Sequence, residues 1–71
     1  MHNNQSSEDY LETILVLSKQ KPVVRSIDIV EELGYKKSSI SVAMKNLRER
    51  NHIEMSKEGF ITLTPSGRQI A

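Results

Sequence analysis

The stretch SSISVAMKNL, residues 38–47, constrains the fold of this 71-residue chain more than any other. Its apolar residues recur at the i, i+3, i+4 and i+7 spacing of a single helix face. They are Ile40, Ala43, Met44 and Leu47. The opposite face carries short or polar side chains, namely Ser38, Ser41, Val42, Lys45 and Asn46. Because small side chains let a helix backbone approach another surface closely, this pattern predicts a helix that packs on one side and enters a groove of an anionic polymer on the other.

Weaker patterns on the N-terminal side predict two further helices. An apolar face at about 7–19 indicates the first, and Pro22 with the two valines after it ends that helix. Ser26 is expected to cap a short second helix, which would stop at Gly34 because glycine tolerates the left-handed conformation at a helix end. A short turn then leads to the helix at about 38–50. Two short helices joined by a Gly-containing turn form the helix-turn-helix pattern.

In the C-terminal third, the spacing of apolar residues changes from helical to alternating. Ile53 and Met55 alternate with polar neighbours, the SKEG segment after them is typical of a turn, and β-favouring residues follow it. These features predict a hairpin at about 52–63. Pro65 then indicates a last helix capped by Thr64, because proline is favoured at the first helical position.

The order of these elements predicts a mostly α fold with a small antiparallel β-hairpin, namely a winged helix-turn-helix. It would have three helices, a two-stranded wing and the start of a fourth helix, in one domain at 7–71 after a flexible tail at 1–6. The chain has no cysteine, so neither a disulfide nor a thiolate metal site can support the small core. No apolar run is long enough to span a membrane or to act as a signal peptide, so we expect a cytoplasmic protein without membrane contact.

The distribution of charge is more informative than its total. The formal net charge is only +1, which does not by itself indicate a nucleic-acid partner. Between residues 25 and 50, however, there are six basic side chains and four acidic ones. Lys36 and Lys37 are expected in the turn before the groove-facing helix, where they could reach phosphates. This mild bias supports nucleic-acid binding only together with the fold.

Three segments of the chain carry a resemblance to a known family: EDYLETILVL, VRSIDIVEELGYKKSSISVAMKNLRERNHIEM and ITLTPSGRQIA. They resemble the N-terminal domain of the diphtheria-toxin-repressor family, bacterial transcriptional repressors that depend on iron or manganese. The resemblance covers residues 8–71, and its first segment is the most discriminating because it combines an acidic residue, Tyr10 and Glu12 in one turn. It implies a winged helix that binds operator DNA as part of a homodimer, with binding controlled by metal.

The resemblance also implies a metal site. Two carboxylates of the first helix commonly contribute ligands in that family, and by their place in the motif these match Asp9 and Glu12. Their i, i+3 spacing puts both on one helix face, and oxygen ligands favour Mn²⁺ or Fe²⁺ over thiophilic metals. In the family, the remaining ligands and the dimer interface belong to a helical domain that follows. We therefore expect Mn²⁺ or Fe²⁺ and a homodimer in a longer parent protein, and no stable metal binding by this chain alone.

The fold and the resemblance together predict an interface for double-stranded DNA. The helix at about 38–50 is expected in the major groove and the hairpin at about 52–63 on the DNA backbone. Serine hydroxyls would donate to phosphates or base edges, Val42 would pack on a thymine methyl, and basic side chains would contact phosphates. The candidate DNA-binding residues are Arg25, Lys36, Lys37, Ser38, Ser39, Ser41, Val42, Lys45, Arg48 and Lys57.

Protein–protein interaction and catalysis are less well supported by the sequence than DNA binding. A winged helix can serve as a protein–protein interaction module, without metal control, if its recognition face carries an exposed apolar cluster. Only Val42 is apolar on the predicted face, which favours DNA. Catalysis has little support, since the chain has no G-x-S-x-G motif, no phosphate-binding loop and no paired-acid cleft. We expect neither an enzyme nor a small-molecule substrate.

Overall fold

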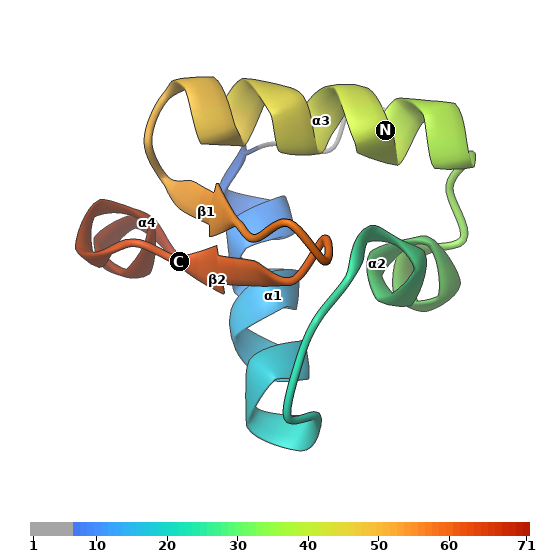
Figure 1. Ribbon diagram of the computed structural model, residues 1–71, viewed down its shortest axis with the longest axis horizontal. Helices are drawn as coiled ribbons and strands as arrows, with labels where there is room; N and C mark the ends of the chain where they lie inside the picture. The colour runs from blue at the N-terminus through green and yellow to red at the C-terminus, as the bar shows by residue number, and fades with distance from the viewer. Residues whose placement is uncertain (1–6) are drawn as a thin grey trace.

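The computed structural model describes residues 7–71, which form helices and one hairpin in the predicted order (Figure 1). The elements are α1 (Ser7–Gln20), α2 (Ser26–Leu33), α3 (Lys37–Glu49), β1 (Ile53–Met55), β2 (Ile61–Leu63) and α4 (Pro65–Ile70). In Figure 1, α3 lies across the top, with α2 below its N-terminal end, the hairpin below its C-terminal half and α1 behind the hairpin. This arrangement confirms the predicted winged helix-turn-helix. The predicted flexible tail, 1–6, lies outside the described residues.

The hydrophobic core forms where the first three helices and the hairpin meet. From α3 it receives Ile40, Met44 and Leu47, the face predicted from the helical spacing. On the opposite face of the same helix, Ser41 and Lys45 are exposed. The other buried apolar side chains are Leu11, Ile14, Leu17, Val24, Ile29, Ile53 and Ile61. Packing therefore holds α3 by its apolar face and leaves the polar face outward. Across residues 7–71, no helix combines the length and the apolar character needed to cross a membrane.

The start of α2 differs from the prediction. Arg25, not Ser26, is the N-cap residue, because its backbone is extended (φ −124°, ψ 167°) and Ser26 is already helical. The carboxylate of Asp28, in the first turn of α2, accepts a hydrogen bond from the backbone N–H of Arg25 at 2.8 Å. An acidic side chain inside the helix thus stabilises the end that sequence reasoning assigned to the Ser26 hydroxyl.

The turn between α2 and α3 is set by backbone conformation. Gly34 ends α2 as predicted, with a left-handed φ of 74° and its N–H donating to the Val30 carbonyl at 2.8 Å. Apart from its neighbours along the chain, no atom of residues 7–71 lies within 4 Å of the position that a Cβ would take, so the need for glycine arises from φ. α3 starts at Lys37 and ends at Glu49, one residue earlier at each end than predicted. Lys37 therefore lies in the helix and not in the turn, because the extended N-cap residue is Lys36 (φ −64°, ψ 144°).

The wing is a short antiparallel hairpin. Ile53 pairs with Leu63 and Met55 with Ile61, so the paired strands lie within the predicted range of 52–63. In the link between α1 and α2, the carbonyl of Val24 accepts a hydrogen bond from the Ile61 N–H at 2.7 Å. This bond ties the chain just before the helix-turn-helix to the second strand of the wing.

Thr64 joins the hairpin to α4. Its hydroxyl donates to the Asn51 carbonyl at 2.8 Å and accepts from the backbone N–H of Gly67 at 3.1 Å, which confirms the predicted cap. A Cβ on Gly67 would clash with the backbone carbonyl of His52. Glycine is therefore required where α4 approaches the segment between α3 and β1.

Candidate nucleic-acid interface

The outward face of α3 is open along the helix. Its exposed residues include Ser38, Ser39, Ser41, Val42, Lys45 and Asn46. Val42 is 60% exposed, the most of the large apolar side chains described as exposed. The major groove of B-DNA admits an α-helix, and hydroxyl, amide and methyl groups are the ones that read base edges there. The face thus has the shape and the chemistry for that groove.

Positive charge lies toward both ends of this face. Lys36 and Lys37 lie at the start of α3, whereas Lys45 and Arg48 lie in its second half. Within residues 7–71, none of these four side chains forms an ion pair. Their charges are therefore not neutralised inside the described part of the molecule, as phosphate binding requires.

The two lysines at the start of α3 oppose the helix dipole. Lys36 is the N-cap residue, Lys37 begins the helix, and the first turn contains no acidic residue. The N-terminus of a helix carries partial positive charge, so a cation there costs roughly 0.3–1 kcal/mol where an anion would stabilise. Lysines at the positive end of a helix dipole are unfavourable for that helix, so their presence here indicates binding to an external anion.

A small notch lies between the start of α2, α3 and β1. It has a volume of about 240 Å³ and is lined by Ser26, Ser41, Met44, Lys45, Arg48 and Met55. Nη1 of Arg48 lies 3.9 Å from the sulfur of Met55, so this side chain leans toward the wing. Two cations and two hydroxyls around the notch are the donors that a phosphate group accepts from.

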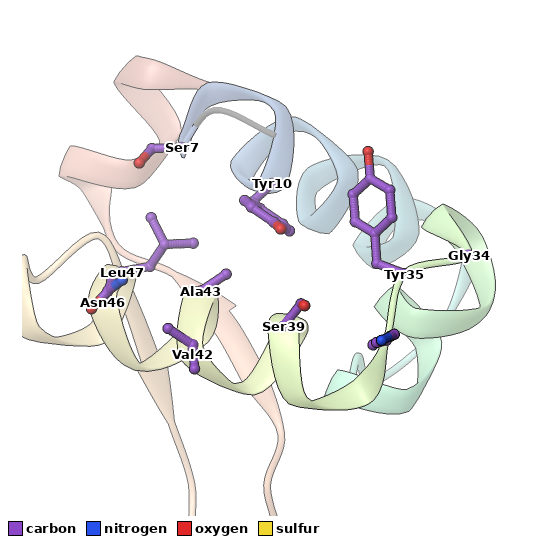
Figure 2. Close-up of a pocket in the computed structure, with 10 residues that line it drawn as sticks. Ser7, Tyr10, Gly34, Tyr35, Ser39, Val42, Ala43, Asn46 and Leu47 are labelled. Atoms are coloured by element: carbon purple, nitrogen blue, oxygen red, sulfur yellow. The ribbon is translucent and has the colours of Figure 1, made fainter. Parts of the chain in front are cut away.

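A wider hollow flanks α3 on the side of α1 (Figure 2). It has a volume of about 770 Å³ and is lined by Ser7, Tyr10, Gly34, Tyr35, Lys36, Ser39, Val42, Ala43, Asn46 and Leu47. In Figure 2, Tyr10 projects from α1 into the space beside α3. Tyr35 extends from the turn between α2 and α3, near Tyr10. Burial raises the pKa of Tyr10, and the nearby Tyr35 phenol raises it further, so Tyr10 keeps its proton at neutral pH. The polar lining therefore consists mainly of neutral hydroxyl and amide groups.

Four polar residues of this hollow are absent from the predicted DNA-binding set: Ser7, Tyr10, Tyr35 and Asn46. Asn46 lies on the outward face that helical spacing identifies, so spacing alone could have added it. Ser7 and Tyr10 gave no such signal, because they belong to α1 and reach the hollow only through the packing of α1 beside α3.

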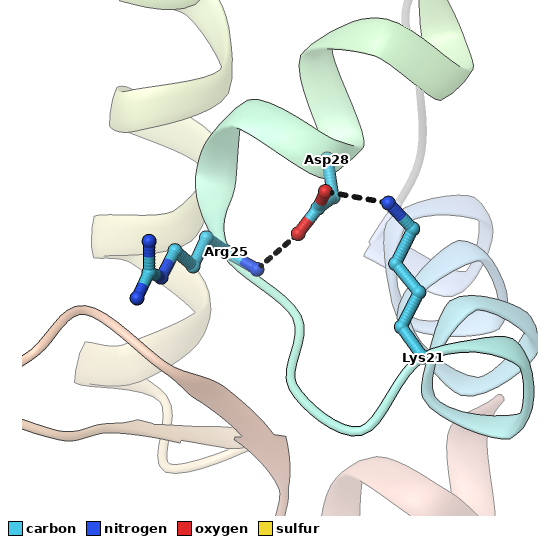
Figure 3. A network of polar contacts seen from close by, with 3 residues as sticks. All are labelled: Lys21, Arg25 and Asp28. Atoms are coloured by element: carbon cyan, nitrogen blue, oxygen red, sulfur yellow. Dashed lines mark hydrogen bonds and ion pairs between the residues drawn. The ribbon is translucent and has the colours of Figure 1, made fainter.

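Arg25 lies at the junction of α2 and the wing. Its guanidinium carbon is 4.7 Å from the centre of the Phe60 ring. Its backbone N–H is held by Asp28, which also pairs with Lys21 at 2.9 Å (Figure 3). The hydrogen bond from Lys21 and then that from the Arg25 backbone hold the pKa of Asp28 below its ordinary value. Lys57, the other candidate on the wing, is exposed in the turn between the strands.

The two candidate metal ligands, Asp9 and Glu12, do not form a metal site by themselves. Asp9 and Glu12 are exposed in the N-terminal part of α1. No set of three or more histidine, cysteine, aspartate or glutamate side chains is arranged to hold a metal ion within residues 7–71. His52 instead shares a hydrogen bond between its Nδ1 and the Ser66 hydroxyl at 3.1 Å. Two carboxylates do not meet the octahedral coordination of Mn²⁺, so this part of the chain does not fit a complete site.

Comparison with known proteins points to a single family. The family described as "Iron dependent repressor, N-terminal DNA binding domain" matches residues 3–64. The HTH-type transcriptional regulator MntR of Geobacillus kaustophilus (strain HTA426) is 35% identical over 65 residues. The regulators of that name in Geobacillus thermodenitrificans (strain NG80-2) and Bacillus pumilus (strain SAFR-032) are 34% identical over the same length. Each match covers 92% of this chain but only 45–46% of the relative, so the chain spans about half the length of the curated relatives it matches.

Proposed function

This chain belongs to the family of iron- and manganese-dependent repressors and contains its DNA-binding domain, and from this premise we propose that α3 reads operator DNA in the major groove. The wing would follow the DNA backbone beside it. One observation supports the proposal most: short hydroxyl side chains on the outward face of α3 are flanked by cations without an ion pair inside residues 7–71. Small side chains let a helix backbone approach base edges, and cations neutralise phosphates.

The proposed interface has two groups of residues, those that contact base edges and those that contact phosphates. Ser38, Ser39 and Ser41 donate hydrogen bonds to base edges or phosphates, and Val42 packs on a thymine methyl. The phosphate contacts, which position the domain without specifying sequence, are Arg25, Lys36, Lys37, Lys45, Arg48 and Lys57.

The two flanks of α3 face the two strands of the duplex in this arrangement. The notch beside the wing receives a phosphate of one strand, with Lys45 and Arg48 as its cations. The hollow beside α1 faces the sugar–phosphate backbone of the other strand, where Tyr10 and Asn46 offer neutral donors. Contacts from α1 thereby extend the interface beyond the helix-turn-helix.

The salt dependence of DNA binding tests the electrostatic part of the proposal. Fluorescence anisotropy with a non-specific duplex should show affinity falling steeply between about 50 and 200 mM salt. Lys37→Gln should weaken binding to all sequences about equally and lower the log–log slope by about one. Lys19→Gln, at the far end of α1, is the matched control with an unchanged slope. Salt-independent affinity would refute the proposal, and an unchanged slope in Lys37→Gln would remove that residue from the interface.

A second measurement tests base reading. Val42→Ala should change the preference between operators that differ at a single thymine, by about 1 kcal/mol, because the contact with the thymine methyl is lost. Competition binding with paired duplexes measures this preference. An equal loss on every duplex would reject the reading role of Val42.

Control by metal would belong to a longer protein. Asp9 and Glu12 are our proposed contribution of this chain to a metal centre, and the other donors must come from residues outside the described set. Two copies would bind one operator, because a single module makes few phosphate contacts. In a Mn²⁺ titration followed by backbone NMR, residues 8–12 should broaden more than Glu31 and Glu32. Equal broadening would remove Asp9 and Glu12 as ligands.

The domain would therefore act by binding DNA in the bacterial cytoplasm and not by catalysis. A protein partner on the same face is not favoured, because Val42 is the large apolar side chain that α3 exposes. Protein-docking surfaces need a larger apolar patch than one valine provides.

A further inference from the structure

Phe60 lies where the wing meets the start of α2. Its ring is half-buried, and the guanidinium carbon of Arg25 lies 4.7 Å from the ring centre. In Figure 3, the Arg25 side chain extends from the start of α2 toward α3 and the hairpin. A cation at this distance over an aromatic ring is attracted by the negative face of the ring. The contact thus joins two elements that are distant in sequence.

The backbone beneath this pair is fixed by hydrogen bonds. The N–H of Ile61 donates to the carbonyl of Val24 at 2.7 Å, which links the neighbours of Phe60 and Arg25. The N–H of Arg25 donates to the Asp28 carboxylate at 2.8 Å. The stacked side chains therefore extend from anchored backbone positions, unlike a pair of mobile surface residues.

The contact with the ring uses none of the hydrogen-bond donors of Arg25. The guanidinium carbon lies 4.7 Å from the ring centre, and the five N–H donors of the group point outward in its own plane. Among residues 7–71, no carboxylate forms an ion pair with this side chain. Ser26, the next residue in the chain, lines the notch together with Lys45 and Arg48. Arg25 thus brings a further cation to the region of the notch.

We propose that Phe60 is a positioning residue for DNA binding, which holds the Arg25 guanidinium so that its edges meet a backbone phosphate between α2 and the wing. This inference rests on the proposed function of the α3 face and the wing. Phe60 makes no phosphate contact itself. A free arginine side chain must be ordered when DNA binds, whereas a stacked one is already ordered. Loss of the ring should therefore weaken binding without changing the number of charges that are neutralised.

Anisotropy titrations over a salt series test this role. Phe60→Leu should lower DNA affinity about two- to fivefold, the range expected for an exposed cation–π contact, with an unchanged salt slope. Arg25→Gln should lower the slope by about one. In the Arg25→Gln background, Phe60→Leu should cause no further loss, because no cation remains to be held. Phe60→Tyr, which keeps an aromatic face, should restore most of the affinity, and Val16→Ala on the distant face of α1 is the neutral control.

Arg25→Lys tests the contact from the other side and does not depend on the stability of Phe60→Leu. It keeps the charge but loses the planar group, so affinity should fall with an unchanged slope. In NMR spectra, the ring-current shift of the Arg25 side-chain protons should disappear in Phe60→Leu. Equal losses from Phe60→Leu in both Arg25 backgrounds, with normal salt dependence, overturn the positioning role alone. Absence of salt-dependent binding by the unaltered chain overturns the proposed function and the positioning role with it.

Discussion

The two flanks of α3 differ in charge although they belong to the same helix. Beside α2 and the wing, Lys45 and Arg48 line a notch of about 240 Å³. Beside α1, a hollow of about 770 Å³ is lined mainly by neutral side chains such as Tyr10 and Tyr35, together with Lys36. Charge-driven binding depends steeply on salt, whereas hydrogen bonding by neutral groups does not. In the proposed complex with DNA, one side of α3 would therefore make the salt-dependent contacts and the other side mainly salt-independent ones.

The largest predicted effect is a loss of stability, from a substitution in the core beneath α3 that supports both flanks. Ile40 is fully buried beneath α3, so Ile40→Ala should lower the free energy of unfolding by about 2–5 kcal/mol through the cavity it leaves. Chemical unfolding followed by circular dichroism measures this loss. Val42→Ala on the opposite face is the matched control and should change stability by less than about 0.5 kcal/mol. Similar losses in the two variants would contradict the packing of α3.

The next effect concerns the basic flank. Lys45→Gln and Arg48→Gln should each weaken DNA binding by about 1 kcal/mol at low salt, because each removes a charged hydrogen-bond donor to phosphate. Together they should lower the salt slope by about two. Anisotropy titrations from low to physiological salt measure both quantities. An unchanged slope in the double variant would remove the contrast between the flanks.

A smaller effect is expected on the neutral flank. Ser39→Ala and Asn46→Ala should each cost about 0.5–1 kcal/mol of binding free energy, because each removes an uncharged hydrogen bond. The salt slope should stay that of the unaltered chain, which distinguishes this flank from the basic one. Unaffected affinity in the double variant would show that the hollow faces away from the DNA.

The smallest effect concerns the acid that anchors the start of α2. The hydrogen bonds from Lys21 and from the Arg25 backbone lower the pKa of Asp28 in the folded state. This carboxyl therefore stabilises the fold above its unfolded pKa of about 3.9, and the contribution is lost as the pH falls through the lower folded value. Asp28→Asn should reduce the thermal stability slightly at neutral pH, and the difference from the unaltered chain should shrink as the pH falls below about 3.9. A difference in melting temperature that stays constant over that acidic range would contradict this role.

Much of the fold followed from local patterns. The spacing of Ile40, Met44 and Leu47 predicted the buried face of α3, and Gly34 and Thr64 marked helix ends that the structure confirms. The predicted N-cap residue of α2, Ser26, was wrong. The prediction depended on the general preference for serine at that position. In this chain, the extended backbone lies one residue earlier, at Arg25, and the carboxylate of Asp28 stabilises it from inside the helix.

The candidate site was predictable only in part. The outward residues of α3 follow from the helical period, and their role in DNA binding stays a prediction. The family resemblance that the first segment indicated is confirmed by the match of residues 3–64. The assignment of Asp9 and Glu12 as metal ligands stays a prediction, since the described residues hold no complete donor set.

The sequence by itself determined which side of α3 is buried and which is left for a partner, because the period of a helix is a local property of neighbouring residues. Only the tertiary structure decided what stands on each flank of that helix. Tyr10 reaches the hollow through the packing of α1, Arg25 stacks on Phe60 across the base of the wing, and Arg48 leans toward Met55. These contacts depend on the angles at which separate elements pack, and the spacing of residues within a single element does not determine such an angle.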